Sequence, residues 1–156
     1  MTRRMWMAAL ALIGLFIAAY LTLYHYGYIG TLTCSATHGC ETVQTSKWSK
    51  LLGLPVAAWG LGYYALVFAL TVVGVQDRLA ESRQLATGLA LLTGWGAVFS
   101  AWLTYLEGFA IHAWCQWCLA SATIALLLFA VSLLDWRRLG RLPPDSPDAG
   151  VPAMSR

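Results

Sequence analysis

The sequence predicts an all-α integral membrane protein, a bundle of four transmembrane helices with an extramembrane loop between the first and second. Its composition is the first observation: 59% of the 156 residues are apolar and only 11% are charged, whereas a soluble domain is about 25% charged. The second observation is that four runs contain no Asp, Glu, Lys or Arg, and these runs cover residues 5–24, 54–75, 85–106 and 114–134.

Each run is long enough to cross a bilayer, because about 20 helical residues span a ~30 Å hydrocarbon core. Backbone polar groups in lipid must pair within their own segment, so we expect each run to be one helix. A soluble protein could bury one such helix, but not four in a chain with so little polar surface. We expect residues 1–141 to form one helical domain. Residues 142–156, which are polar and rich in proline, should be a disordered cytoplasmic tail.

The basic residues divide unevenly between the two ends of these helices. The loop over residues 27–53 contains only Lys47 and Lys50, and the loop over 107–113 contains no Lys or Arg. All the arginines lie before the first run, between the second and third, or after the fourth: Arg3, Arg4, Arg78, Arg83, Arg137, Arg138, Arg141 and Arg156. The positive-inside rule then predicts that both termini are cytoplasmic.

The connections between the runs differ in length and character. Residues 25–53 are rich in Gly, Thr and Ser and should begin as a loop. The stretch "TSKWSKLLG" (45–53) predicts a short amphipathic helix on the membrane surface, with Gly53 ending it and Pro55 in the first turn of the second run. The connection "QDRLAESRQ" (76–84) is short, so the second and third helices should be antiparallel neighbours.

All four cysteines fall on the side predicted to be outside, where disulfides form and persist. They are Cys34, Cys40, Cys115 and Cys118. Three explanations compete: structural disulfides, a four-cysteine zinc site and a thiol–disulfide relay. Zinc ligand pairs usually lie two to four residues apart, which disfavours the wider spacing of Cys34 and Cys40. A Cys-x-x-Cys disulfide is easily reduced, which favours chemistry over stapling.

The relay has a physical basis in the position of Cys115 and Cys118. They should occupy the first turn of the last helix, on one face of it. The partial positive charge at a helix N-terminus stabilises a thiolate, which is the attacking species. The pair also lies at the edge of the hydrocarbon, within reach of a lipid-dissolved quinone such as ubiquinone or menaquinone. Cys34 and Cys40 would be a second, mobile pair in the aqueous phase on the outer side of the membrane.

The segments around these cysteines resemble the vitamin K epoxide reductase family. The matching parts are "CSATHGCETVQTSKWSKLLGLPVAAWGL" (34–61) and "CQWCLAS" (115–121). The resemblance implies four helices around a quinone pocket and no metal. The small size resembles the bacterial, disulfide-forming, DsbB-like branch, in the bacterial inner membrane. Members of that branch oxidise a separate periplasmic thioredoxin-like thiol oxidase of the DsbA type.

The resemblance also implies a role for each matching residue. A Cys34–Cys40 disulfide would receive electrons when the partner attacks Cys34. Cys40 would then attack a Cys115–Cys118 disulfide at Cys115, and the released Cys118 would reduce the quinone. Ser46 matches a serine near the quinone, and it would bind a quinone carbonyl or hold the loop.

Two positions depart from the animal members of the family. The animal enzymes carry Asn at a position near Val56 and Tyr at the position of Ala122, and these differences favour plain quinone reduction over epoxide reduction. Two alternatives stay open: an epoxide or quinone reductase of the animal type, and a non-catalytic membrane protein whose disulfides only staple loops. No basic stripe interleaved with aromatics indicates a nucleic-acid partner, so the expected partners are lipid, quinone and the thiol oxidase.

Other polar residues on the outer side have simple default interpretations. His25, His38 and His112 should be solvated or interfacial, with His38 the best candidate for tuning the loop cysteines. Glu41 and Glu107 should be solvated, with a proton role at the quinone as the alternative. Three tryptophans inside the helices could line the quinone pocket: Trp59, Trp95 and Trp102.

Overall fold

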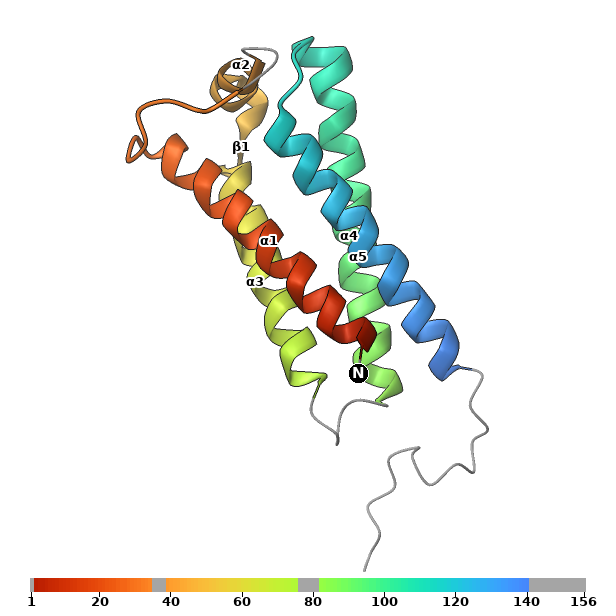
Figure 1. Cartoon of the computed structure of the whole chain (residues 1–156). Coiled ribbons are helices and arrows are strands. Elements are labelled where there is room, and N and C mark those ends of the chain that lie inside the picture. The colour runs from red at the N-terminus through yellow and green to blue at the C-terminus, as the bar shows by residue number, and fades with distance from the viewer. Residues whose placement is uncertain (1, 35–38, 76–81, 141–156) are drawn as a thin grey trace, which may run out of the picture.

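Four long helices form the body of the protein (Figure 1). The computed structural model describes residues 2–34, 39–75 and 82–140. The long helices are α1 (Thr2–His25), α3 (Val56–Val73), α4 (Arg83–Leu106) and α5 (Gln116–Leu139). Each is long and apolar enough to cross a membrane. The predicted all-α membrane bundle is therefore confirmed, whereas the predicted tail, residues 142–156, lies outside the described residues.

The helix ends differ from the limits of the apolar runs by a few residues. α1 begins at Thr2 and α5 continues to Leu139, because the flanking arginines are compatible with helix and simply lie beyond its apolar part. α3 begins only at Val56, since Leu54 and Pro55 have extended backbone. Capping and backbone geometry decide where these helices end, while apolarity predicts where they lie.

The loop between α1 and α3 folds into α2 (Gly39–Thr45), a 3₁₀ turn (η1, Lys47–Ser49) and a hairpin of two short strands. Strand β1 (Lys50–Leu51) pairs antiparallel with β2 (Leu54–Pro55). The prediction of an amphipathic helix over residues 45–53 is wrong beyond Ser49. Leu52 and Gly53 both have positive φ, of 53° and 82°, which a two-residue hairpin turn requires and a right-handed helix excludes.

The helices pack as two close pairs, α1 with α3 and α4 with α5. The Tyr64 ring of α3 lies directly over Gly14 of α1, where any Cβ would collide with it. Its hydroxyl donates to the Ser121 carbonyl of α5 at 2.7 Å, so this one side chain links three helices. α3 and α4 are in contact, as their short connection predicted, although a cavity separates part of their facing sides.

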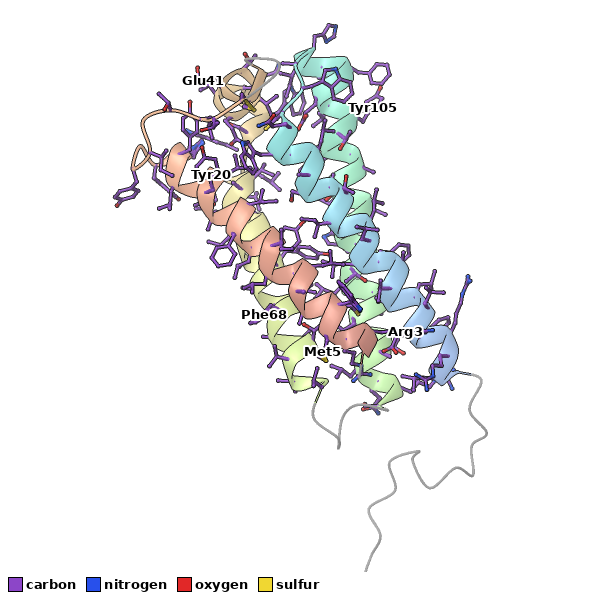
Figure 2. All side chains as sticks on the ribbon, viewed as in Figure 1. Arg3, Met5, Tyr20, Glu41, Phe68 and Tyr105 are labelled. Carbon is purple, nitrogen blue, oxygen red and sulfur yellow. A yellow bond between two sulfur atoms is a disulfide. The ribbon has the colours of Figure 1, made fainter. Side chains whose placement is uncertain are left out.

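The end of the bundle that holds the N-terminus is tied by a buried arginine. Arg4 is only 4% exposed, and it pairs with Asp135 of α5 at 3.2 Å and donates to the Gly74 carbonyl beyond α3 at 2.6 Å. Arg3 lies at this end, whereas Glu41 and Tyr105 lie at the opposite end (Figure 2). The opposite end carries α2 and the start of α5, and therefore the cysteines.

Candidate active site

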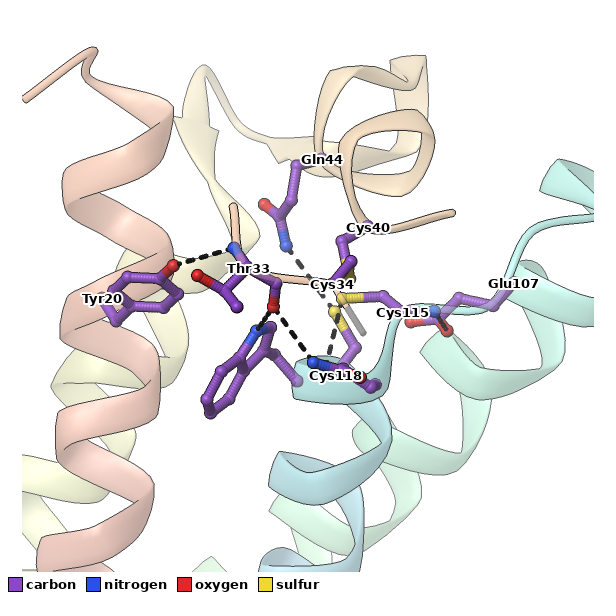
Figure 3. The surroundings of a disulfide bond; sticks show 10 residues. Tyr20, Thr33, Cys34, Cys40, Gln44, Glu107, Cys115 and Cys118 are labelled. Carbon is purple, nitrogen blue, oxygen red and sulfur yellow. Dashed lines mark hydrogen bonds between the residues drawn. A yellow bond between two sulfur atoms is a disulfide. The ribbon is translucent and has the colours of Figure 1, made fainter. Parts of the chain in front are cut away.

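The four cysteines come together at one end of the bundle (Figure 3). Cys40 in α2 and Cys115 at the start of α5 are both fully buried in one apolar cluster, and Cys34 and Cys118 pack against it. Cys34 and Cys40 form a disulfide with a Cα–Cα distance of 6.3 Å, while Cys115 and Cys118 are free thiols. The fold thus brings two pairs, separated by more than 70 residues in the sequence, into one cluster.

The Cys-x-x-Cys pair takes its shape from the start of α5. Cys115 has extended backbone (φ −102°, ψ 112°) and is the N-cap, and its Sγ accepts from the Cys118 N–H at 3.4 Å. Cys118 therefore lies in the first turn of the helix as expected, whereas the expectation that Cys115 lies there too is wrong, since its extended backbone places it just before the helix. A hydrogen bond from the Cys118 thiol lowers the pKa of Cys115 below its ordinary value, against the opposing effect of burial. Cys115 is the sulfur of this pair that ionises more readily.

The segment that leads to Cys34 is held against α1 and α5. The Thr33 carbonyl accepts from Gln116 Nε2 and from Trp117 Nε1, each at 3.0 Å. The Thr33 N–H donates to the Tyr20 hydroxyl at 3.2 Å, and the Tyr20 and Trp117 rings lie 5.4 Å apart. The loop cysteines are thus attached to the helix that carries the other pair.

A glycine allows α2 to approach the loop before α5. A Cβ added to Gly39 would lie 2.6 Å from the Trp114 carbonyl oxygen, closer than real Cβ contacts occur. Gly39 and Trp114 each directly precede a cysteine, Cys40 and Cys115. The absent side chain at Gly39 therefore permits the close approach of these two buried cysteines.

Glu107 is buried in the centre of the site and is only 3% exposed. The interpretation of Glu107 as a solvated acid is wrong, whereas Glu41 is exposed as expected. Glu107 begins a π-helical turn (η2, Glu107–Ile111) at the end of α4. Its Oε2 accepts from the Cys115 N–H at 3.0 Å, and its carbonyl accepts from the Ala113 N–H at 3.2 Å. The turn thereby directs a carboxylate back toward the Cys-x-x-Cys pair.

Gln44 of α2 reaches the other sulfur of the pair. It is 7% exposed, and its Nε2 lies 3.6 Å from Cys118 Sγ, to which it donates a weak hydrogen bond (Figure 3). Sequence reasoning missed Gln44, because nothing in the sequence distinguishes it from a polar loop residue. Its position four residues after Cys40, one helical turn along α2, is the signal that could have found it.

An apolar cavity of about 680 Å³ opens beside the cysteines, between α3 and α4. Cys118 and Glu107 line its cysteine end. The cavity is within the size range of small-molecule sites, about 300–1,000 Å³. Trp59 and Trp95 line it as expected, whereas Trp102 is absent from the lining. Apolar residues of the loop before α3 line it as well, namely Trp48 of the 3₁₀ turn and Leu51 and Leu52 of the hairpin.

Two hydroxyl groups belong to this cavity. Ser46 lines it, and its Oγ donates to the Val43 carbonyl at 2.8 Å, so the hydroxyl also holds the turn after α2. The Tyr63 hydroxyl, which sequence reasoning missed, is buried and has no hydrogen-bond partner among the described residues. It lies against Gly96 of α4, well along the helix from the cysteines.

The histidines lie outside this arrangement. His25 is partly exposed at the end of α1, and His112 is exposed just before the Cys-x-x-Cys pair. His38, the best histidine candidate in the sequence, lies outside the described residues. Within residues 2–34, 39–75 and 82–140, no group of three or more His, Cys, Asp and Glu side chains is placed to hold a metal ion.

Comparison with known families agrees with this site. A sequence model described as the vitamin K epoxide reductase family matches residues 5–133, which include most or all of each of the four long helices and all four cysteines. Members of that family are oxidoreductases of membranes associated with quinone and vitamin K chemistry. The chain belongs to the vitamin K epoxide reductase family.

Proposed function

We propose that this protein is a quinone-dependent thiol–disulfide oxidoreductase that makes disulfides. It takes electrons from a thioredoxin-like partner of the DsbA type and passes them through its two cysteine pairs to a quinone. One observation carries this proposal: the two cysteine pairs share one cluster, and Cys118 of the Cys115–Cys118 pair lines a large apolar cavity. The cysteines that would carry electrons from the partner therefore adjoin a cavity that could hold the quinone acceptor.

The first half of the reaction is thiol–disulfide exchange. The partner's two thiols reduce the Cys34–Cys40 disulfide, beginning with attack on Cys34, which is half-buried while Cys40 is fully buried. The Cys40 thiolate then attacks Cys115 of a Cys115–Cys118 disulfide and releases Cys118. Attack of Cys34 on Cys40 restores the Cys34–Cys40 disulfide and frees Cys115. In the resulting state Cys34 and Cys40 form a disulfide and Cys115 and Cys118 are thiols, as in the structure.

The second half moves two electrons from Cys115 and Cys118 to the quinone. The sulfur next to the cavity is that of Cys118, so this sulfur should meet the quinone ring. The cavity walls are mostly apolar, as an isoprenoid quinone requires, and the Tyr63 hydroxyl, which has no partner among the described residues, is a polar group in the wall farther from the cysteines. Ser46 also lines the cavity, and its hydroxyl could bond a quinone carbonyl only by giving up its bond to the Val43 carbonyl.

The cavity favours plain quinone reduction over reduction of vitamin K epoxide. Val56 and Ala122, which replace the polar residues of the animal enzymes, both line the cavity. Their side chains offer no hydrogen bond to an epoxide oxygen. This agrees with the bacterial, DsbB-like branch of the family.

The expected orientation places the cysteine end outside the bacterial inner membrane and both termini in the cytoplasm. Among the described residues, the arginines lie at the end opposite the cysteines: Arg3, Arg4, Arg83, Arg137 and Arg138. An excess of arginine at one end marks the cytoplasmic side. The cysteines would then face an oxidising compartment.

Purified protein in lipid nanodiscs tests the function directly. With a reduced DsbA-type thiol oxidase as donor and short-chain ubiquinone or menaquinone as acceptor, we expect one quinol formed for each disulfide made in the donor. The absorbance change of the quinone gives the amount of quinol formed, and thiol titration of the donor gives the number of disulfides made. A protein that only staples its loops would show no turnover.

The same preparation distinguishes the proposed function from an animal-type epoxide reductase. That alternative predicts consumption of vitamin K epoxide when dithiothreitol is the reductant. We expect no epoxide consumption beyond that of a sample without protein. Epoxide turnover faster than quinone turnover would contradict the proposed function.

Gly39→Ala should slow the exchange between the two pairs. The new Cβ would force α2 away from the Trp114 carbonyl, and so Cys40 away from Cys115. A displacement of about 1 Å can cost about 100-fold in rate, so we expect the exchange to slow by about 10- to 100-fold. Rapid-quench trapping of thiols with N-ethylmaleimide after mixing with reduced donor measures the exchange.

The matched control is Gly30→Ala, because a Cβ at Gly30 has open space around it. This variant should exchange at the wild-type rate. Quinone reduction by pre-reduced Cys115 and Cys118 should be unchanged in both variants. An unimpaired exchange in Gly39→Ala would show that α2 need not contact this loop.

A further inference from the structure

We propose that Glu107 is the catalytic residue that takes the proton of the Cys118 thiol during quinone reduction and passes it to the reduced quinone. This inference rests on the proposed function and names a further group in the same site. The Glu107 carboxylate is buried, accepts a hydrogen bond from the Cys115 backbone, and lines the cavity together with Cys118.

The surroundings of Glu107 are unusual for an acid. It is 3% exposed, and Lys and Arg make no recorded ion pair with it among the described residues. Burying a carboxylate without a counter-charge is costly, and the hydrogen bond from the Cys115 N–H offsets only part of that cost. Such a residue is a poor choice for structure alone, since an amide would accept the same hydrogen bond without the charge.

The carboxylate also lies against the backbone of the reacting pair. Oε2 accepts from the Cys115 N–H at 3.0 Å, which holds the carboxyl against the start of α5, three residues before Cys118. The titratable side chains that interact electrostatically with it are those of Cys118 and Cys115. Glu107 and Cys118 both line the cavity, so one carboxyl is within reach of the thiol and of the space for a quinone oxygen.

Gln44 completes the arrangement from the opposite side. Its amide donates to Cys118 Sγ at 3.6 Å, which would stabilise a thiolate after the proton has left. A base on one side of the thiol and a donor on the other are what formation of a thiolate in an apolar site requires. The π-helical turn that begins at Glu107 gives the carboxyl this direction, and such turns occur often at functional sites.

The protons and electrons balance as follows. Two S–H bonds break, of Cys115 and Cys118, and one S–S bond and two quinol O–H bonds form. The two electrons pass to the quinone. The Cys118 proton moves to Glu107 and then to one quinol oxygen. The Cys115 proton leaves to water at the cysteine end, and the second quinol oxygen takes one proton from water.

Glu107→Gln tests this role, because the amide oxygen still accepts from the Cys115 N–H but the side chain cannot take a proton. We expect single-turnover quinone reduction by pre-reduced enzyme to slow by at least about 100-fold at neutral pH. Thiol exchange with a reduced donor, measured without quinone, should keep its wild-type rate. Glu107→Asp, which retains a carboxylate, should recover part of the lost rate.

The pH dependence separates proton transfer from a merely structural role. In Glu107→Gln, Cys118 must lose its proton to water, so the rate of quinone reduction should rise about tenfold per pH unit below the pKa of that thiol. The rate of the wild-type enzyme should depend far less on pH over the same range. The matched control is Glu41→Gln, because Glu41 is an exposed acid on α2 at the same end.

Each outcome decides a different question. A wild-type enzyme that exchanges thiols but does not reduce quinone would overturn the proposed function. A wild-type enzyme that reduces quinone, with Glu107→Gln equally fast, would overturn the role of Glu107 alone. If Glu107→Gln does not fold, Glu107→Asp and the pH profile of the wild-type enzyme still test the role of Glu107. A wild-type rate that rises tenfold per pH unit would show that water, not Glu107, takes the proton.

Discussion

Cys118→Ala is expected to abolish quinone reduction, by a factor of at least about 1,000, because it removes the sulfur that lines the cavity. Cys115 is fully buried beside Cys40 and is absent from the cavity lining, so it cannot take over this step. The measurement is single-turnover quinone reduction by enzyme that has been reduced and freed of excess reductant. The fold should persist, because a small apolar side chain suits this partly buried position.

Cys118→Ser is the matched control for cavity shape. It keeps the volume of the side chain but cannot form a disulfide, so it should be as inactive as Cys118→Ala. Both variants should still bind quinone, which quenching of the fluorescence of Trp59 and Trp95 in the cavity wall would report. Turnover at the wild-type rate in either variant would remove Cys118 from its assigned role.

The same variants should change the ionisation of Cys115. The hydrogen bond from the Cys118 thiol is the largest cause that lowers the pKa of Cys115, so its loss in Cys118→Ala should raise that pKa. The wild-type thiolate therefore persists to lower pH than the thiolate of the variant. A pH titration of thiolate absorbance, with Cys115→Ala as the blank, measures both values.

Cys34→Ala is expected to accumulate a disulfide between Cys40 and Cys115. The variant lacks the thiol that would displace Cys115 from Cys40, so the exchange should stop halfway. Cys40 and Cys115 are buried in one cluster, so little rearrangement is needed to join them. Peptide mapping under non-reducing conditions should recover the linked peptides, and Cys118 should be alkylated as a free thiol.

The double variant Cys34→Ala, Cys115→Ala is the control for this trap. It should contain no Cys40–Cys115 link, and a Cys40–Cys118 link in its place would show that attack is not selective for Cys115. Recovery of Cys40 only as a free thiol in the single variant would contradict the relay between the pairs.

The sequence alone determined the membrane fold and the proposed location of the chemistry. Apolar runs without charge predict helices because an unpaired backbone cannot be tolerated in lipid, and this holds whatever the helices pack against. The spacing of Cys115 and Cys118 predicts neighbouring sulfurs for the same local reason, since residues three apart lie on one helix face. The Cys34–Cys40 pairing followed from the family resemblance, and the structure contains it.

Only the tertiary structure decided which cysteine faces the cavity, where that cavity lies and that Glu107 is buried. These properties depend on contacts between segments distant in the sequence: α2 against the start of α5, and α3 against α4. A loop glutamate between two apolar runs is expected in water, and burial follows only because the π-helical turn directs its side chain inward. Burial is a property of packing, so a local pattern of residues cannot predict it.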